Sequence, residues 1–285
     1  GLVFGQCLTA VGWVGGTLPK LTEKEGMIDL SMADVANGGI VAGAGLSMRR
    51  PIYVIRYQGF NWFNAPIILN YSCKSKELWD MPCPIFIRGI AMEGSIGPVA
   101  GSSHSSIYYK MPGIKIVSPM TPKEYIYSYK YFMKNTDVLY VSEHRGSYDN
   151  EFELKDYLPE KCDLIVFAIS ITRFEALKAK NILEKKGYKI GIANIFWINP
   201  FKIKSRWIEV LNKAKYGGII IDDDYTQGIA ESLAFRILEK ANKNVKIKAL
   251  GLKNRSAGFS KKSDNLPPNQ YEILDKIQKI INEKK

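Results

Sequence analysis

The sequence has few cysteines and histidines and no long apolar run, and each scarcity excludes a class of protein. The long uncharged stretch at residues 57–73 falls short of the roughly 18 apolar residues that a membrane span needs. Polar amides interrupt it at Gln58, Asn61, Asn64 and Asn70, so we interpret it as buried helix and loop. The four cysteines are far apart and lack CxxC spacing, which excludes a disulfide scaffold and favours free thiols in a reducing cytoplasm. They are Cys7, Cys73, Cys83 and Cys162.

Several familiar catalytic motifs are also absent. The chain contains no GxxxxGK[ST], no HExxH, no GxSxG and no GxGxxG that opens a helix after a strand. The run Asp222-Asp223-Asp224 at a predicted strand end is a candidate cation site, but three consecutive acids do not face one point. We therefore interpret the run as a solvated turn and expect no metal site in this chain.

The formal charge of +12 is concentrated in the second half of the chain. Residues 1–150 carry 14 Lys and Arg against 11 Asp and Glu, a net of +3, whereas residues 151–285 carry 26 against 17, a net of +9. Lysines at helical spacing are typical of solvated helix faces rather than of a nucleic-acid groove. They are Lys178, Lys180, Lys185, Lys186, Lys202 and Lys204. We expect a small-molecule substrate, with neither nucleic acid nor a membrane as partner.

Short β-rich runs alternate with stretches of helical period, which is typical of parallel sheets covered by helices on both faces. In the first half, strands are predicted at 2–4, 52–57, 84–88, 114–117 and 138–141, and helices at 33–48, 62–76 and 123–134. In the second half, strands at 164–168, 189–195, 218–222 and 245–250 alternate with helices at 173–186, 205–213, 228–240 and from 270 onward. The pattern predicts an α/β protein with two three-layer α/β/α domains and mostly parallel sheets.

A polar, tyrosine-rich segment without apolar period separates the two halves at residues 144–161. We predict a first domain over residues 1–148, a linker over 149–161 and a second domain over 162–285.

The first half contains what resembles one side of a pocket for a flat heterocycle. Asp34 stands at a predicted helix start, and the small residues 37–45 follow it and allow close approach of a ring or a backbone. Tyr57, Phe60 and Phe63 then offer aromatic faces three residues apart. The other side of this site must come from another chain.

Residues 94–106 form a run of small residues that includes Ser103 and His104. Such a run makes a poor helix or strand but a good substrate loop, in which a histidine can donate, accept or carry a proton near neutral pH. The alternative is a surface loop with an incidental histidine.

These features resemble a known family. The matching motifs are IDLSMAD with GGIVAGAGLSMRRPI, NYSCK at 70–74, the loop with His104, MPGIKIVSPMTPKEY at 111–125, and Glu143-His144-Arg145. Residues 2–283 resemble the beta subunit of thiamine diphosphate-dependent 2-oxo acid dehydrogenases of the pyruvate, branched-chain and acetoin types, and more broadly the second half of transketolase. The resemblance implies a pyrimidine-binding domain followed by a transketolase C-terminal domain.

The resemblance also implies a cofactor and a partner. The cofactor would be thiamine diphosphate, and an alpha-type subunit would hold its diphosphate and Mg²⁺ through a GDG motif that this chain lacks, in a two-plus-two heterotetramer active only when assembled. Asp34 matches the glutamate that hydrogen-bonds the aminopyrimidine and promotes cofactor deprotonation. Phe60 matches the aromatic on the pyrimidine face, Tyr57 and Phe63 match its flanking aromatics, and His104 matches the histidine that faces substrate.

Three departures from the family accompany this match. Asp34 stands where the family has glutamate, which is longer by one methylene, about 1.5 Å of reach. The segment 104–112 is shorter than its family counterpart by about one helical turn, which reshapes the substrate loop. The family's opening helix does not precede Gly1, which we interpret as trimming upstream or as a short subunit.

Two other functions stay open at this point. The first is the C-terminal half of a split transketolase, in which Arg145 would bind a sugar phosphate beside Ser103 and His104. Alternatively, Arg145 is a surface charge of the linker without a binding role. The second is a non-catalytic scaffold half, with Asp34 as the mark of weakened cofactor activation.

Overall fold

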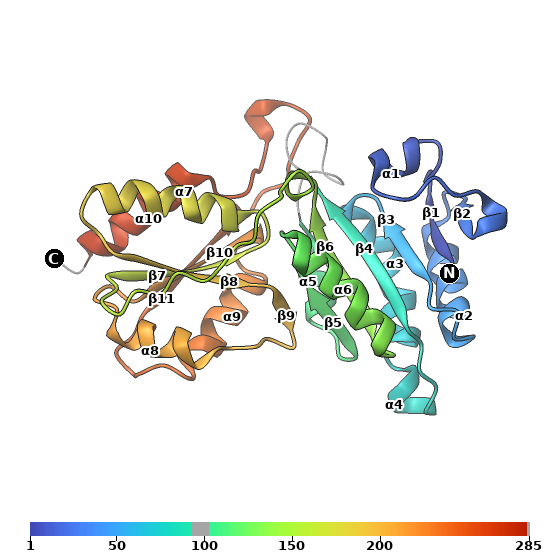
Figure 1. Cartoon of the computed structure of the whole chain (residues 1–285), viewed down its shortest axis with the longest axis horizontal. Helices are drawn as coiled ribbons and strands as arrows, with labels where there is room; N and C mark the ends of the chain where they lie inside the picture. The colour runs from blue at the N-terminus through green and yellow to red at the C-terminus, as the bar shows by residue number, and fades with distance from the viewer. Residues whose placement is uncertain (93–102, 284–285) are drawn as a thin grey trace.

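The structure, a computed structural model, describes residues 1–92 and 103–283 and consists of two mostly parallel sheets with helices on both faces (Figure 1). The first sheet has seven strands in the order β2-β1-β3-β4-β6-β5-β9, and the second has four in the order β11-β10-β7-β8. The predicted α/β class is therefore confirmed. The predicted loop residues 94–102 lie outside the described residues.

The strands of the first sheet carry alternating side chains to two helical layers. They are β1 (Val3–Gln6), β2 (Met27–Leu30), β3 (Ile52–Ile55), β4 (Ile85–Ala91), β5 (Ile114–Val117), β6 (Val138–His144) and β9 (Trp197–Asn199). Ile85 and Ile87 of β4 pack in the same cluster as α2 and α3, whereas Phe86 packs against Phe132 of α6. Because successive strand side chains point to opposite faces, this seven-residue strand supplies both cores.

The helical elements of the first half cover these faces and connect the strands. They are α1 (Gly12–Gly16), η1 (Glu23–Glu25), α2 (Asp34–Leu46), η2 (Gln58–Phe60), α3 (Asn61–Ile67), η3 (Ile68–Ser72), α4 (Ser75–Trp79), α5 (Ser106–Tyr109), α6 (Pro122–Lys134) and η4 (Arg145–Ser147). Pro122 opens α6, where its missing N–H costs no hydrogen bond and its fixed φ suits the helix.

The second sheet is built from β7 (Leu164–Ile169), β8 (Ile190–Ile195), β10 (Gly218–Tyr225) and β11 (Ile247–Leu252). Its helical elements are α7 (Thr172–Lys185), α8 (Ser205–Lys213), α9 (Ile229–Leu238), η5 (Lys261–Ser263) and α10 (Gln270–Asn282). Figure 1 shows α7 and α10 on one face of the sheet and α8 and α9 on the other. The strand β7 serves both layers, since Val166 packs with α7 and α10 while Phe167 packs with Trp207 of α8.

The short strand β9 belongs to the second half of the sequence but pairs antiparallel with β5 of the first sheet. Asn199 reinforces the pairing through its side-chain amide, which donates to the Ile114 carbonyl at 2.8 Å. Trp197 packs edge-on against Tyr131 of α6, with ring centroids 5.0 Å apart. A strand of three residues carries too little periodicity to be predicted, and it joins the two halves of the chain.

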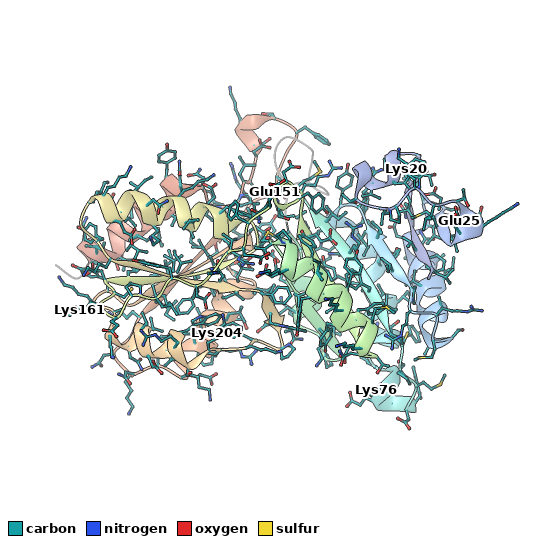
Figure 2. The ribbon with its side chains drawn as sticks, in the orientation of Figure 1. Lys20, Glu25, Lys76, Glu151, Lys161 and Lys204 are labelled. Atoms are coloured by element: carbon teal, nitrogen blue, oxygen red, sulfur yellow. The ribbon has the colours of Figure 1, made fainter. Side chains whose placement is uncertain are left out.

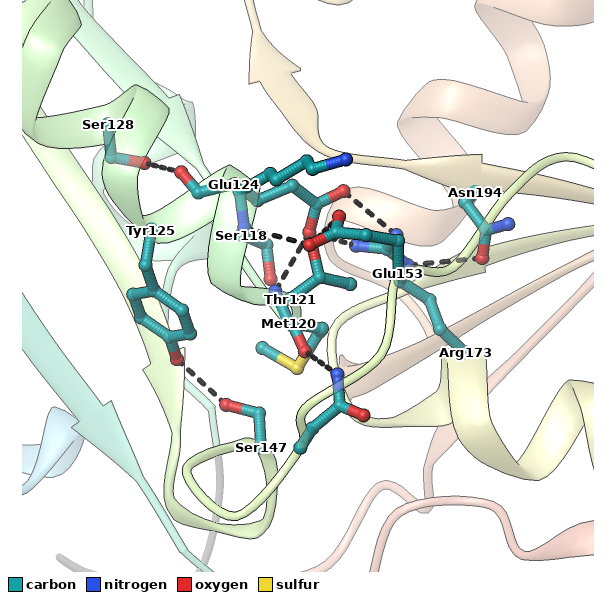
Figure 3. Close-up of polar contacts among 12 residues, drawn as sticks. Ser118, Met120, Thr121, Glu124, Tyr125, Ser128, Ser147, Glu153, Arg173 and Asn194 are labelled. Atoms are coloured by element: carbon teal, nitrogen blue, oxygen red, sulfur yellow. Dashed lines mark hydrogen bonds and ion pairs between the residues drawn. The ribbon is translucent and has the colours of Figure 1, made fainter.

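Polar contacts also join the two halves, as the close-up in Figure 3 shows. The Arg173 guanidinium of α7 forms two bonds to the Glu124 carboxylate of α6, at 2.7 and 2.9 Å, and a third to Asn194 at 3.1 Å. The predicted linker contributes Glu153, whose carboxylate accepts from the Thr121 hydroxyl at 2.8 Å and from the Lys123 N–H at 3.0 Å. The segment predicted as a linker is therefore packed against the start of α6.

One predicted helix is wrong in extent. The helix expected over 62–76 is divided into α3, the π-helical turn η3 and α4. Pro66 lies inside α3 and supplies no N–H to its hydrogen-bond ladder, which accounts for the departure from regular α-helix that follows. By contrast, β5 and α8 begin and end at the predicted residues.

The lysines of the second half are mostly solvated, as predicted. Figure 2 shows Lys161 at the outer edge of this half, and both Lys161 and Lys204 are exposed. Lys180 is the correction, because it is buried, lies 4.1 Å from the centre of the Tyr157 ring and pairs with Glu184. Within the described residues, none of the helices has the length and apolar character required to cross a membrane. The four cysteines are free thiols.

Candidate functional site

Asp34 occupies the first position of α2 and is held by a chain of polar side chains. The Asn64 amide nitrogen of α3 donates to Asp34 Oδ1 at 3.1 Å, and the Tyr53 hydroxyl of β3 donates to Asn64 Oδ1. Burial and, to a smaller extent, the Asp34 charge raise the pKa of Tyr53 well above its usual value, so the hydroxyl remains a donor. The orientation of the half-buried Asp34 carboxylate is therefore fixed from α3 and β3.

A small cavity of about 80 Å³ lies beside this carboxylate, at the carboxyl ends of β1 and β3. Asp34, Phe60 and Asn64 form part of its wall. The remaining lining residues are Gln6, Cys7, Met32, Tyr53, Val54, Ile55 and Arg56. The Asp34 carboxylate, the rings of Phe60 and Tyr53 and the aliphatic side chains of β3 thus surround a space suited to a flat ring with a hydrogen-bonding edge.

The predicted aromatic series is assembled around Phe60. The Phe60 ring lies 6.1 Å from Tyr57 and 6.5 Å from Phe63, both in tilted geometry. Phe60 lines the cavity, but Tyr57 and Phe63 do not belong to the described residues that line it, and Phe63 is 49% exposed. The sequence spacing therefore predicted that the three rings are neighbours, and of these three only Phe60 lines the cavity.

Ser103 and His104 are buried at the start of the segment that leads into α5. Gln58 of η2 accepts bonds from both residues, from the Ser103 hydroxyl at 3.1 Å and from the His104 N–H at 2.7 Å. Burial lowers the pKa of His104 to about 4, so its imidazole is neutral at pH 7. His104 is not among the lining residues of the Asp34 cavity, but η2 contacts both places, through Gln58 at one end and Phe60 at the other.

Arg145 is exposed at the start of η4 and lines a different cavity, of about 570 Å³. The floor of this second cavity holds a buried ion pair in which Arg88 Nε and Nη2 donate to the Glu143 carboxylate at 2.7 and 2.8 Å. The Tyr148 hydroxyl donates to the same carboxylate at 2.7 Å. The structure therefore does not bring Arg145 and Asp34 together.

The acidic run Asp222-Asp223-Asp224 was predicted as a solvated turn, and this prediction is wrong. All three residues lie in β10 and are at most 2% exposed. Asp223 accepts from the Ser170 hydroxyl at 2.7 Å, and Asp224 accepts from the Ser106 N–H at 3.0 Å. Among the residues that the structure describes, no group of three or more acidic, cysteine or histidine side chains is arranged to hold a metal ion. The run instead anchors neighbouring segments.

Replacing Asp222 by asparagine is expected to stabilise the fold increasingly as the pH rises. Asp222 Oδ2 is buried and has no hydrogen-bond partner in the described part of the chain, and burial followed by repulsion from Asp223 and Asp224 raises the pKa of Asp222. An acid whose pKa is raised in the folded chain still holds its proton at pH values where the unfolded chain has released it. The free energy of unfolding therefore falls as the pH rises from about 4, the unfolded-state pKa, toward the folded-state pKa.

Asparagine keeps the acceptor for the Asp223 N–H but has no proton to lose. We expect the free energy of unfolding to rise by about 1–3 kcal/mol at pH 8 and by less at pH 5. Thermal melts at both pH values measure it, with the exposed Asp275→Asn as control. A gain that does not depend on pH would contradict this account.

Sequence reasoning missed three residues of the site: Tyr53, Asn64 and Gln58. The available signal was the set of amides that interrupt the apolar stretch 57–73, since a buried amide needs hydrogen-bond partners. The partners could not be read from the sequence, because Gln58 contacts residues 31 and 84 positions away.

Comparisons with known proteins match both halves of the chain to known domains. The model of the transketolase pyrimidine-binding domain matches residues 10–150, and that of the transketolase C-terminal domain matches residues 156–264. The chain is a member of the transketolase family. Asp34 and His104, the candidate site residues of this transketolase-family chain, both lie within the residues matched by the pyrimidine-binding domain.

Individual relatives are distant in sequence but cover most of the chain. The pyruvate dehydrogenase E1 component subunit beta of Bacillus subtilis (strain 168) is 23% identical, over 98% of this transketolase-family chain and 92% of the relative. The 2-oxoisovalerate dehydrogenase subunit beta of the same organism is 26% identical, over 76% of this chain and 70% of the relative. A solved structure described as a split gene transketolase, inactive beta4 tetramer, superposes with a TM-score of 0.72 at 14% identity, covering 100% of this chain and 92% of that one, and shares its fold.

Proposed function

We propose that this chain is the pyrimidine-side, beta-type subunit of a two-chain thiamine diphosphate-dependent enzyme. The enzyme would decarboxylate a 2-oxo acid or cleave a ketol donor and transfer the resulting acyl or ketol unit. The observation that carries the proposal is the small cavity with the Asp34 carboxylate and the Phe60 ring in its wall. The relatives named as beta subunits of pyruvate and 2-oxoisovalerate dehydrogenase support it.

The residues of this cavity fit the aminopyrimidine part of the cofactor. Its volume of about 80 Å³ suits a single ring, with Phe60 for the ring face and Asp34 for a ring nitrogen. The larger remainder of the cofactor, with its diphosphate and Mg²⁺, would then lie against a partner, in keeping with the missing GDG motif. When bound, the cofactor supplies stabilisation of a carbanion next to a carbonyl carbon.

The roles of the chain's own residues follow from their contacts. Asp34 would hold a proton at the ring nitrogen, and Asn64 and Tyr53 would keep its carboxylate in place. Aspartate reaches less far than the glutamate that the resemblance implies at this position, so the placement of its carboxylate is critical. A misplacement of the carboxylate by about 1 Å costs on the order of a hundredfold in rate. His104, neutral at pH 7, would accept a proton from substrate or acceptor before donating one.

Exposed apolar side chains around the cavity support a partner subunit. Met32, Val35 and Ile40 lie exposed in or beside α2, and Trp62 and Phe63 lie exposed on α3. Clustered apolar exposure of this kind marks interaction surfaces. The proposed occupant is an alpha-type subunit that brings the diphosphate and Mg²⁺ site, in a two-plus-two heterotetramer.

The isolated chain is expected to bind thiamine diphosphate weakly, because one side of the site and the metal ligands are missing. Calorimetric titration of the cofactor, with Mg²⁺, into the chain alone and into its complex with a GDG-containing partner measures the difference. We expect at least a hundredfold tighter binding by the complex, about 2.7 kcal/mol. Tight binding by the chain alone would contradict the two-chain proposal.

A second candidate is half of a split transketolase. The superposition with the split gene transketolase structure and the placement of Arg145 beside a cavity favour it. Turnover of a ketose phosphate donor, and not of a 2-oxo acid, by the assembled enzyme would select this candidate.

A further inference from the structure

The fully buried side chain of Gln58 lies between the strands β4 and β6 and the segment that carries His104. Its amide nitrogen donates to the Gly89 carbonyl of β4 at 3.1 Å and to the Ser142 hydroxyl of β6 at 2.9 Å. Its amide oxygen accepts from the Ser103 hydroxyl and from the His104 N–H. The nitrogen also approaches the Glu143 carbonyl at 3.5 Å. A primary amide has two N–H donors and one oxygen with two lone pairs, so the four shorter bonds already use its full capacity.

The chemistry of the partners fixes the orientation of this amide. A backbone N–H can only donate and a backbone carbonyl can only accept, so the oxygen must face His104 and the nitrogen must face Gly89. Gly89 and Ser142 are also register partners in the pairing of β4 with β6. The His104 backbone is thus tied, through one side chain, to two paired inner strands of the first sheet.

The other end of the same short segment is tied to the second half of the chain. The Ser106 N–H donates to the buried Asp224 carboxylate at 3.0 Å, and the His104 ring lies 6.4 Å from the Tyr225 ring. Residues 103–106 are therefore anchored at both ends by buried side chains. Gln58 is the anchor adjacent to the imidazole.

We propose that Gln58 is the positioning residue of His104. It sets where the imidazole meets the substrate, and through η2 it links that position to Phe60 in the wall of the cofactor cavity. This inference rests on the proposed function insofar as His104 carries a proton during the reaction. The hydrogen bonds that hold His104 can be tested without turnover.

Imidazole NMR of the full chain provides that test, because the only two histidines are His104 and His144. Gln58→Met keeps the length of the side chain and removes all hydrogen bonds of the amide. We expect the His104 ring resonance to move and its titration midpoint to rise from near pH 4 by at least one unit toward 6.5, as water reaches the loosened segment. His144, which caps η4, is expected to keep its own midpoint near 4.

Two further variants make the result decisive. Gln6→Met changes a glutamine at the same end of the sheet, whose amide nitrogen has no partner in the described structure, and should leave both histidine signals in place. Ser142→Ala removes a single bond to Gln58 and should move the His104 signal in the same direction by less, which keeps the test available if Gln58→Met does not fold. An unmoved His104 signal, or equal movement of both histidines, would overturn the proposal.

Kinetics of the assembled enzyme separate positioning from function. Gln58→Met is expected to lower kcat at least tenfold with a smaller change in KM, since the bonds hold a proton carrier rather than substrate. If the NMR signal moves as expected while kcat stays unchanged, the proton-carrying role of His104 fails and the positioning by Gln58 stands.

Discussion

Asp34→Ala is expected to lower cofactor-dependent turnover of the assembled enzyme by at least a hundredfold. The carboxylate is the acidic group in the wall of the small cavity, and general acid–base catalysis by a positioned group contributes about 10² to 10⁴ in rate. Removing it takes one of two acceptors from the Asn64 amide nitrogen, which still donates to the Phe60 carbonyl, and leaves the apolar core of the domain unchanged. Steady-state kinetics with saturating cofactor and partner measure the effect.

Asp275→Ala, at an exposed site of α10, serves as the matched control and should retain full turnover. A tenfold or smaller loss on Asp34→Ala would instead favour a non-catalytic scaffold half. Asp34→Glu extends the probe, because a gain in rate would show that the reach of the aspartate limits the reaction, whereas a loss would show that Asn64 and Tyr53 set the carboxylate for the shorter chain.

Glu124→Gln is expected to destabilise the protein by about 3 kcal/mol, equivalent to a fall in melting temperature of roughly 6–12 °C. The substitution keeps the shape of the side chain but leaves the Arg173 guanidinium, 0% exposed, without a counter-charge. A buried charge that loses its partner bears the full cost of desolvation. Thermal and urea unfolding of the full chain measure the change.

The same substitution at an exposed ion pair provides the control. Glu209→Gln breaks the pair with Arg206, in which both side chains are about half exposed, and should cost less than about 0.5 kcal/mol. The double variant Glu124→Leu, Arg173→Met should recover part of the loss, since it removes both charges together. Equal effects at Glu124 and Glu209 would show that the contact between the two halves contributes little to stability.

Local pattern was sufficient for much of the fold. The alternation and helical period of the sequence located β5 and α8 to the residue, and the small residues after Asp34 do form the helix α2. The acidic run failed because its composition predicts solvent exposure, whereas its burial depends on Ser106 and Ser170, which are 118 and 53 residues away.

The sequence predicted the residue types that line the candidate cavity, but not the buried side chains that hold them in place. Asp34 and Phe60 were identified from residue type and spacing, and the structure places both on one cavity. Gln58 and Asn64 acquire their roles from partners on other strands and helices, and such contacts leave no periodic signal in one sequence. The domain boundaries at 148 and 162 stay a prediction, and β9 shows that the second half contributes to the first sheet.

The pairing of β9 with β5 has a consequence for any attempt to divide the protein. A fragment that ends within residues 149–161 would leave the backbone groups of β5 unpaired along the border of its sheet. Unpaired strand borders recruit other chains, so such a fragment should aggregate or capture the 197–199 strand from an intact copy. Exchange of this strand between two copies would create a dimer without altering a single native contact.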